Sequence, residues 1–71
     1  MGGEIMEKLK AERIRQGITQ TEMARRMDVS QSHASMLESG KYEPSWKTLS
    51  KIARVLDVDL RVVIRSKAVD K

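Results

Sequence analysis

Apolar residues recur along the chain at the spacing of four short amphipathic helices. The first predicted helix, residues 4–16, contains helix-forming residues without Gly or Pro, and Gly17 follows where a helix C-terminus favours it. Ile5 and Leu9 share one stripe of this helix. The next residue on that stripe is Arg13, so we expect a charged side chain to point inward and to need a partner.

Two further helices are predicted very close together, over residues 20–27 and residues 31–38. Thr19 is a good N-cap for the first of them, and Ser30 is a good N-cap for the second. Asp28 occupies the break between them, where we expect a left-handed backbone conformation, which Asp tolerates better than most residues.

Helices joined by so short a turn must cross steeply, and their backbones approach closely only where side chains are small. Ala24 and Ala34 fall at this contact. The second helix is then held by Ala34 and Leu37, and its opposite face carries Gln31, Ser32, Ser35 and Met36. That face suits the edges of base pairs, because Gln and Ser donate and accept hydrogen bonds and Met packs against a thymine methyl group.

A fourth helix is predicted to start after Ser45, its N-cap, and to point one stripe inward: Leu49, Ile52, Ala53 and Leu56. Trp46 lies in its first turn. We expect Trp46 to pack at the edge of the core, as large aromatic residues at helix starts usually do.

The tail, residues 59–71, has two interpretations. Its first part alternates β-branched or apolar residues with mainly charged ones, which favours a strand carrying Val58, Leu60, Val62 and Ile64 on one side. A lone strand in a helical chain would pair with its copy in a second subunit, making these four residues a dimer contact. The alternative is a short fifth helix capped by Asp59, with Leu60, Val63 and Ile64 inward. Propensity favours the strand.

Length and composition restrict the class of protein. Seventy-one residues form one domain with a single small core. The absence of cysteine excludes a disulfide framework and a thiolate metal site. No apolar run suits a membrane span and no leader is evident, so we expect a cytoplasmic protein. We expect residues 1–3 to be a disordered end or an expression remnant, residues 4–58 to form the main domain, and residues 59–71 to form the dimerisation segment.

Candidate chemistry is equally restricted. The formal net charge of +4 is compatible with a polyanionic partner, but many proteins without one share it. His33 is the single histidine and is expected at the core edge of its helix, so no metal site is expected. The chain offers no inward acid pair and no glycine-rich phosphate loop, so we expect no enzyme and no cofactor. With a single domain predicted, we also expect no small-molecule effector.

The chain resembles Cro/repressor-type helix-turn-helix domains of the Xre family. The resemblance covers residues 4–58 and is carried by Gln20, Ala24, the turn at Asp28, Ser30-Gln31, Leu37-Glu38-Ser39-Gly40-Lys41 and the Pro44-Ser45…Leu49 junction. It implies an all-α, compact lambda-repressor-like bundle of four to five short helices. It also implies a third helix that enters the DNA major groove, and two subunits that bind half-sites about one helical turn apart.

The same resemblance assigns roles to single residues. Gln20 matches a glutamine that contacts a phosphate and braces the first residue of the recognition helix, and Arg13 and Glu38 match a partly buried ion pair. The implied base-reading positions are Gln31, Ser32, Ser35 and Met36, and the implied backbone contacts are Ser39 and Lys41. Arg25 and Arg26 either contact phosphates or form a solubilising face.

Two features depart from the family pattern. Asp28 stands in place of the turn glycine, and the recognition helix has no Lys or Arg, so bidentate recognition of guanine from it is not expected.

The leading functional hypothesis is a sequence-specific double-stranded DNA-binding regulator, a repressor that occupies a palindromic operator as a homodimer. One alternative is the antitoxin of a toxin–antitoxin pair, because small Xre-like antitoxins sometimes end in a strand that pairs between subunits. Phage-type repressors and restriction-system controllers are further alternatives. A different class is a protein-interaction module that keeps this fold without binding DNA, which the uncharged recognition helix would favour.

Overall fold

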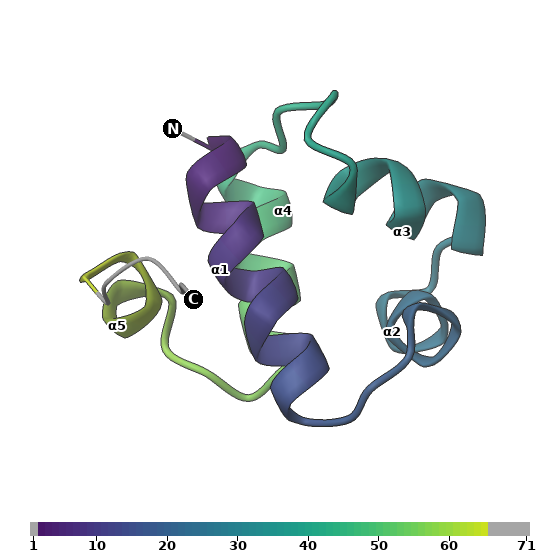
Figure 1. Ribbon diagram of the computed structural model, residues 1–71, viewed down its shortest axis with the longest axis horizontal. Coiled ribbons are helices and arrows are strands. Elements are labelled where there is room, and N and C mark those ends of the chain that lie inside the picture. The colour runs from purple at the N-terminus through teal and green to yellow at the C-terminus, as the bar shows by residue number, and fades with distance from the viewer. Residues whose placement is uncertain (1, 66–71) are drawn as a thin grey trace.

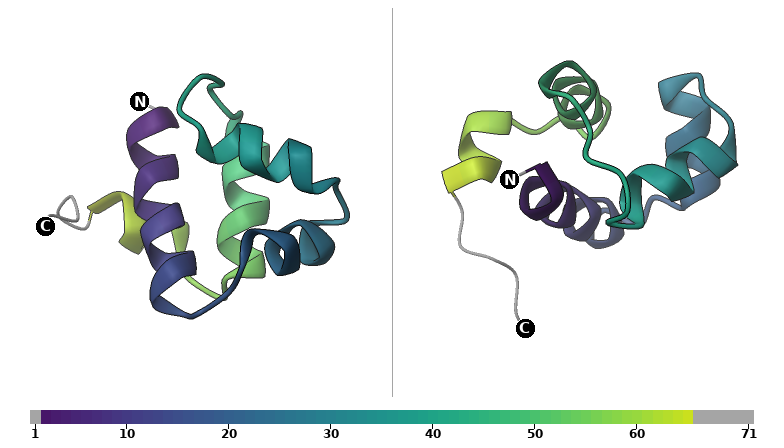
Figure 2. Two further views of the ribbon diagram at one scale, coloured as in Figure 1. Left: turned by 45° about the vertical axis from the view of Figure 1, so that its right-hand side comes forward. Right: turned by 90° about the horizontal axis from the view of Figure 1, so that it is seen from above.

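Helices α1 and α4 lie side by side, with α2 and α3 on one side of this pair and α5 on the other (Figures 1 and 2). The computed structural model describes residues 2–65 of the chain. The elements are α1 (Gly2–Arg15), α2 (Gln20–Met27), α3 (Gln31–Glu38), α4 (Trp46–Val55) and α5 (Leu60–Arg65). The predicted all-α bundle is therefore confirmed. Within residues 2–65, no helix combines the length and apolar character needed to cross a membrane.

The start of α1 differs from the prediction. The helix begins at Gly2 rather than at Glu4, so residues 2 and 3, which we expected to be a disordered end or an expression remnant, are part of α1. Met1 lies outside the described residues. At the other end, Gly17 has a φ of 75°, and its backbone N–H donates to the carbonyl oxygen of Ile14. Glycine reaches this left-handed region without steric cost, which is why the helix ends here as predicted.

The core fills the space between the helices and includes Ile5, Leu9, Leu37 and the predicted inward stripe of α4. Its buried cluster consists of Ile5, Met6, Leu9, Ile18, Met23, Met27, Leu37, Leu49, Ile52, Ala53 and Leu56. Every helix from α1 to α4 contributes to it. Leu37 is thereby anchored in the same core as α1 and α4, so α3 is held from behind by apolar packing.

The turn between α2 and α3 has the predicted geometry. Asp28 is left-handed, with φ 62° and ψ 45°, and its backbone N–H donates to the carbonyl oxygens of Ala24 and Arg25. Ser30 Oγ then accepts the backbone N–H of His33 and caps α3. Ala24 and Ala34 are both buried where α2 packs against α3. Small side chains at this crossing allow the close approach of the two helices.

The predicted C-terminal strand is wrong, and the alternative helix is correct. Asp59 caps α5, because its Oδ1 accepts the backbone N–H of Arg61 at 2.9 Å and its carbonyl oxygen accepts those of Val62 and Val63. Residues 2–65 contain no strand with which this segment could pair. A helix satisfies its own backbone hydrogen bonds, so it forms here despite the β-branched composition.

The four predicted dimer residues consequently do not share one face. Val58 and Leu60 pack against the protein's own core, whereas Val62 is 63% exposed and Ile64 is 37% exposed. Val63, which the strand would have turned outward, also packs against the core. Ile64 is more exposed than the helical alternative implied.

Two further expectations about burial are wrong. Trp46 is 60% exposed, while the preceding Pro44 is buried instead. Trp46 occupies the first position of α4, before the part of the helix that Leu49 and Ile52 anchor in the core. His33 is exposed rather than bordering the core. Helical periodicity predicts the direction of a side chain, but not whether a neighbouring element reaches far enough to cover it.

Candidate nucleic-acid interface

The outward face of α3 and the loop after it form one shallow, open surface. It is lined by Gln31, Ser32, Ser35, Met36, Ser39 and Lys41. All six residues are exposed. The structure therefore brings together the four predicted base-reading residues and two of the predicted backbone contacts.

The end of α3 is shaped by hydrogen bonds of Ser39. Its hydroxyl group donates to the carbonyl oxygen of Met36 at 2.8 Å and accepts the backbone N–H of Lys41 at 3.1 Å. Gly40, with a φ of 84°, turns the chain between these two contacts. Ser39 therefore has a structural role at the end of α3, and its hydroxyl group holds the backbone N–H of Lys41 in place.

The ion pair expected between Arg13 and Glu38 is present and largely buried. Arg13 Nε donates to Glu38 Oε2 at 2.7 Å, and Arg13 Nη2 donates to Glu38 Oε1 at 3.1 Å. The two side chains are only 10% and 4% exposed, respectively. Arg13 Nη1 also donates to the carbonyl oxygen of Ile18. The inward charge of α1 is thus fully engaged and ties α1 to the last residue of α3.

Gln20 is tied to the same carboxylate. Its Nε2 lies 3.1 Å from Glu38 Oε1, so the amide that was expected to brace Gln31 is hydrogen-bonded to the ion pair instead. Gln20 is half-buried at the start of α2. The sequence placed Gln20 and Glu38 in separate roles, and only the packing of α2 on α3 shows that they touch.

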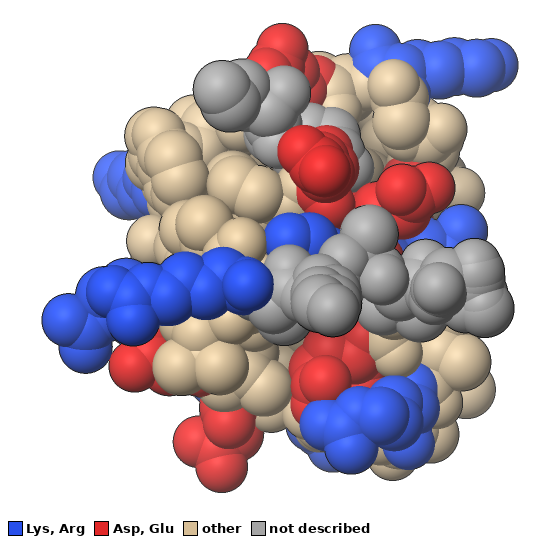
Figure 3. Space-filling view, turned by 60° about the vertical axis from the view of Figure 1, so that its left-hand side comes forward, with Lys and Arg blue, Asp and Glu red and all other residues tan. Residues whose placement is uncertain are grey.

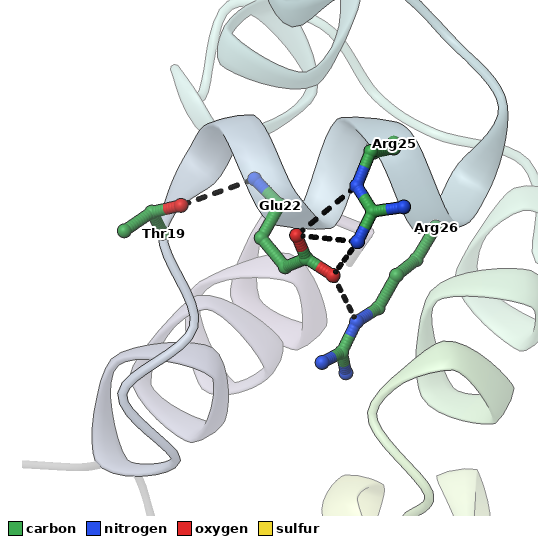
Figure 4. Close-up of polar contacts among 4 residues, drawn as sticks. All are labelled: Thr19, Glu22, Arg25 and Arg26. Carbon is green, nitrogen blue, oxygen red and sulfur yellow. Dashed lines mark hydrogen bonds and ion pairs between the residues drawn. The ribbon is translucent and has the colours of Figure 1, made fainter.

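Arg25, the remaining candidate phosphate contact, belongs to a small charged cluster on α2 (Figure 4). The Glu22 carboxylate accepts hydrogen bonds from Arg25 Nε and Nη2 and from Arg26 Nε, at distances of 2.8 to 3.2 Å. Thr19 Oγ1 accepts the backbone N–H of Glu22, as expected of an N-cap. Sequence reasoning missed this cluster, although the i, i+3 and i, i+4 spacing of the three residues indicates it.

Hydrogen bonds from Arg26 and then from Arg25 hold the pKa of Glu22 below its usual range. Glu22 is ionised at neutral pH, as a glutamate with an ordinary pKa would be, and its charge offsets part of the positive charge of α2. The side chains of Arg25 and Arg26 are 75% and 45% exposed, so both are accessible to another anion.

Comparison with known proteins decides the family. A family model described as helix-turn-helix matches residues 9–63, from α1 through most of α5. The chain belongs to the Cro/repressor-type helix-turn-helix family. No solved structure matches it significantly.

Three curated relatives show how this helix-turn-helix chain compares with known proteins. The "ImmF control region 10 kDa protein" of Bacillus phage phi105 is 42% identical over 55 residues, which cover 78% of this chain and 61% of that protein. An uncharacterized HTH-type transcriptional regulator of Archaeoglobus fulgidus is 40% identical over 53 residues, 75% of each protein. The type II methyltransferase M.Sau96I of Staphylococcus aureus is 42% identical over 62 residues, but these cover only 14% of the enzyme.

The matched family is a helix-turn-helix family, and the Archaeoglobus relative is named a transcriptional regulator. The match covers 87% of this chain but only 14% of the methyltransferase, so the name of that enzyme transfers no catalytic activity.

Helix α3 of this helix-turn-helix protein carries no Lys or Arg, so its positive charge must come from other elements. Helix α4 carries Lys47, Lys51 and Arg54, all exposed, and contains no acidic residue. On the face that brings α5 forward, basic and acidic side chains are intermixed (Figure 3). Base recognition by α3 would therefore depend on uncharged groups, with cations supplied from neighbouring elements.

The Glu22 cluster leads to a test of the role of Arg25. Replacing Glu22 by Gln should raise the affinity for an unrelated duplex, because it releases two cations. The salt slope, which is the slope of the logarithm of the binding constant against the logarithm of the salt concentration, should steepen by up to about 0.9 for each arginine that reaches a phosphate. Fluorescence anisotropy with a labelled duplex at several salt concentrations measures both quantities.

The matched control is Glu12→Gln. It makes the same change in net charge on α1, where the Glu12 carboxylate accepts hydrogen bonds from Arg15 and Gln16. If both variants gain affinity equally, the effect is one of net charge and Arg25 does not contact DNA.

Proposed function

We propose that this protein is a sequence-specific repressor that binds a palindromic operator in double-stranded DNA as a homodimer. Helix α3 enters the major groove, and Gln31, Ser32, Ser35 and Met36 contact the base edges. The observation that carries the proposal is the exposed, uncharged α3 face, which is anchored from behind by the buried Ala34 and Leu37. A face with hydrogen-bonding groups and one apolar group, on a rigid helix, fits the major groove, which is about 12 Å wide.

Affinity and specificity come from different residues in this proposal. Lys41, Gln20, Ser39 and Arg25 contact the phosphate backbone and supply affinity that is independent of sequence. Gln31 begins α3, and the N-terminal part of a recognition helix is the part that reaches base edges. The Gln31 amide can make paired hydrogen bonds to an adenine.

The proposed dimer follows from the symmetry of such sites, whose half-sites lie about 34–36 Å apart. Val58 and Leu60 are used within the subunit, so Val62 and Ile64, which are exposed on α5, are the two of the four predicted dimer residues that remain available to a second copy. We also propose a cytoplasmic, non-catalytic protein without a cofactor or small-molecule effector, regulated by concentration, by dimerisation or by a partner protein.

The proposal predicts different effects for two alanine variants. Gln31→Ala should weaken binding of the preferred duplex by about 1–3 kcal/mol and relax the preference at one base position. Lys41→Ala should weaken binding to every duplex alike and lower the salt slope by about 1. Selecting duplexes from a random library gives the half-site, the spacing and the symmetry, and gel shifts at two salt concentrations then measure each variant. Equal binding of the wild-type protein to all sequences would overturn the proposed specificity.

A second candidate is a protein-interaction module, and the exposure of Trp46 and Tyr42 favours it. Exposed aromatic residues are common anchors of protein interfaces. This function predicts that heparin and duplex columns fail to retain the protein at low salt. The feature that suggested the antitoxin alternative is not found within residues 2–65, because residues 60–65 form the helix α5 and not a pairing strand. A cognate toxin would still be found by co-purification from the native host.

A further inference from the structure

Glu38 connects three helices through one carboxylate. It accepts two hydrogen bonds from Arg13 on α1 and one from Gln20 on α2, while it forms the last residue of α3 itself. Its side chain is 4% exposed, so it cannot contact a DNA molecule lying against α3. Any influence of Glu38 on DNA binding must therefore pass through a neighbouring side chain.

The chemistry of this carboxylate determines how Gln20 is oriented. An ion-paired carboxylate accepts hydrogen bonds but cannot donate one, so the amide nitrogen of Gln20 must face it. With the amide turned over, Gln20 Oε1 would meet Glu38 Oε1 with no proton between the two oxygens. Among the described residues, no buried side-chain nitrogen or oxygen lacks a partner, so the turned amide would introduce an unsatisfied contact into a satisfied site.

We propose that Glu38 is a positioning residue for DNA binding, which sets the orientation of the Gln20 amide. The inference rests on the proposed function, in which Gln20 contacts a phosphate. One N–H and the oxygen of Gln20 remain for partners outside the fold, in a fixed arrangement. A side chain that is already held loses less rotational freedom on binding, which corresponds to about a two- to ten-fold gain in affinity.

A double-mutant cycle tests the proposal. The variant Arg13→Met/Glu38→Leu removes the ion pair as a unit, and with it the acceptor of Gln20. Gln20→Ala is then made in the wild-type protein and in this variant. We expect Gln20→Ala to weaken duplex binding about ten- to hundred-fold in the wild-type protein. In the Arg13→Met/Glu38→Leu background, that factor should be two- to ten-fold smaller. The salt slope should stay unchanged in all four proteins, because the Gln20 amide neutralises no phosphate charge.

Arg13→Lys is the control for stability. It disturbs the geometry of the ion pair but keeps a cation beside Glu38, so the carboxylate remains an acceptor for Gln20 and the affinity per folded molecule should equal that of the wild-type protein. Equal costs of Gln20→Ala in both backgrounds would overturn the inference, as would a loss in Arg13→Lys as large as in the Arg13→Met/Glu38→Leu variant. If the wild-type protein selects no duplex from the random library, the proposed function is wrong, and the inference that rests on it is wrong as well. If the wild-type protein binds strongly and Gln20→Ala costs the same affinity in both backgrounds, the inference about Glu38 is wrong but the proposed function stands.

A measurement on the wild-type protein covers the outcome in which the variants fail to fold. In its NMR spectrum, the side-chain amide protons of Gln20 should exchange with solvent more slowly than those of the exposed Gln31. Equal exchange rates for the two amides would show that Gln20 is not held, and the proposal would be wrong.

Discussion

Replacing Arg13 by Met, or Glu38 by Leu, should lower the free energy of unfolding by about 3–5 kcal/mol, because each change strands a charge in a buried site. The two side chains are 10% and 4% exposed and share two hydrogen bonds. A domain of this length is stabilised by roughly 4–11 kcal/mol in total. Either single change should therefore remove a large part of the stability.

The double variant Arg13→Met/Glu38→Leu should recover most of this loss. Replacing both partners by apolar side chains of similar volume removes the desolvation cost of the two charges together with their attraction. Urea unfolding of the four proteins measures these differences. Arg15→Met is the control, because it breaks an exposed ion pair with Glu12 and should cost less than about 1 kcal/mol. Single variants as stable as the wild-type protein would show that the buried pair contributes nothing.

Ser35→Glu should lower the affinity for any selected duplex by at least about a hundred-fold, since a like charge placed against DNA costs several kcal/mol. Ser35 lies on the exposed α3 face, between Ser32 and Ser39. The fold should be nearly unaffected, with a change in unfolding free energy within about 0.5 kcal/mol. The loss would therefore report on the interface and not on stability.

Ser50→Glu provides the matched control. Ser50 is exposed on α4 and lies beside residues of the α4–α5 connection, away from the α3 face. The change in net charge is the same, so this variant should retain most of the affinity. Anisotropy titrations with the selected duplex measure the affinities of the two variants and of the wild-type protein. If Ser35→Glu binds as tightly as the wild-type protein, α3 does not enter the groove.

Local chemistry explains which parts of the fold could be predicted. Thr19, Ser30 and Ser45 act as caps because a side-chain oxygen accepts a backbone N–H within three residues, a contact that needs no distant partner. Asp28 is left-handed because the short connection between α2 and α3 requires it. The candidate site followed from the same kind of signal, since Ala34 and Leu37 define the buried side of α3 and hence its outward face.

Contacts between distant segments explain what could not be predicted. The Val-rich tail favours a strand by propensity, but residues 2–65 offer it no strand to pair with, and Leu60 and Val63 find a core surface only as a helix. Trp46 lies on the same helical stripe as the buried Leu49, yet no neighbouring element covers its side chain. The link between Gln20 and Glu38 joins residues 18 positions apart and depends on how α2 packs against α3.

The sequence by itself determined where α1 to α4 lie, how α2, α3 and α4 are capped, which faces they bury and that the α3 face is uncharged, because these features depend on neighbours within a few residues. Only the tertiary structure decided the conformation of the tail, the exposure of Trp46 and the shared carboxylate of Glu38. Each of these depends on which surface another helix brings into contact, and periodicity carries no information about that.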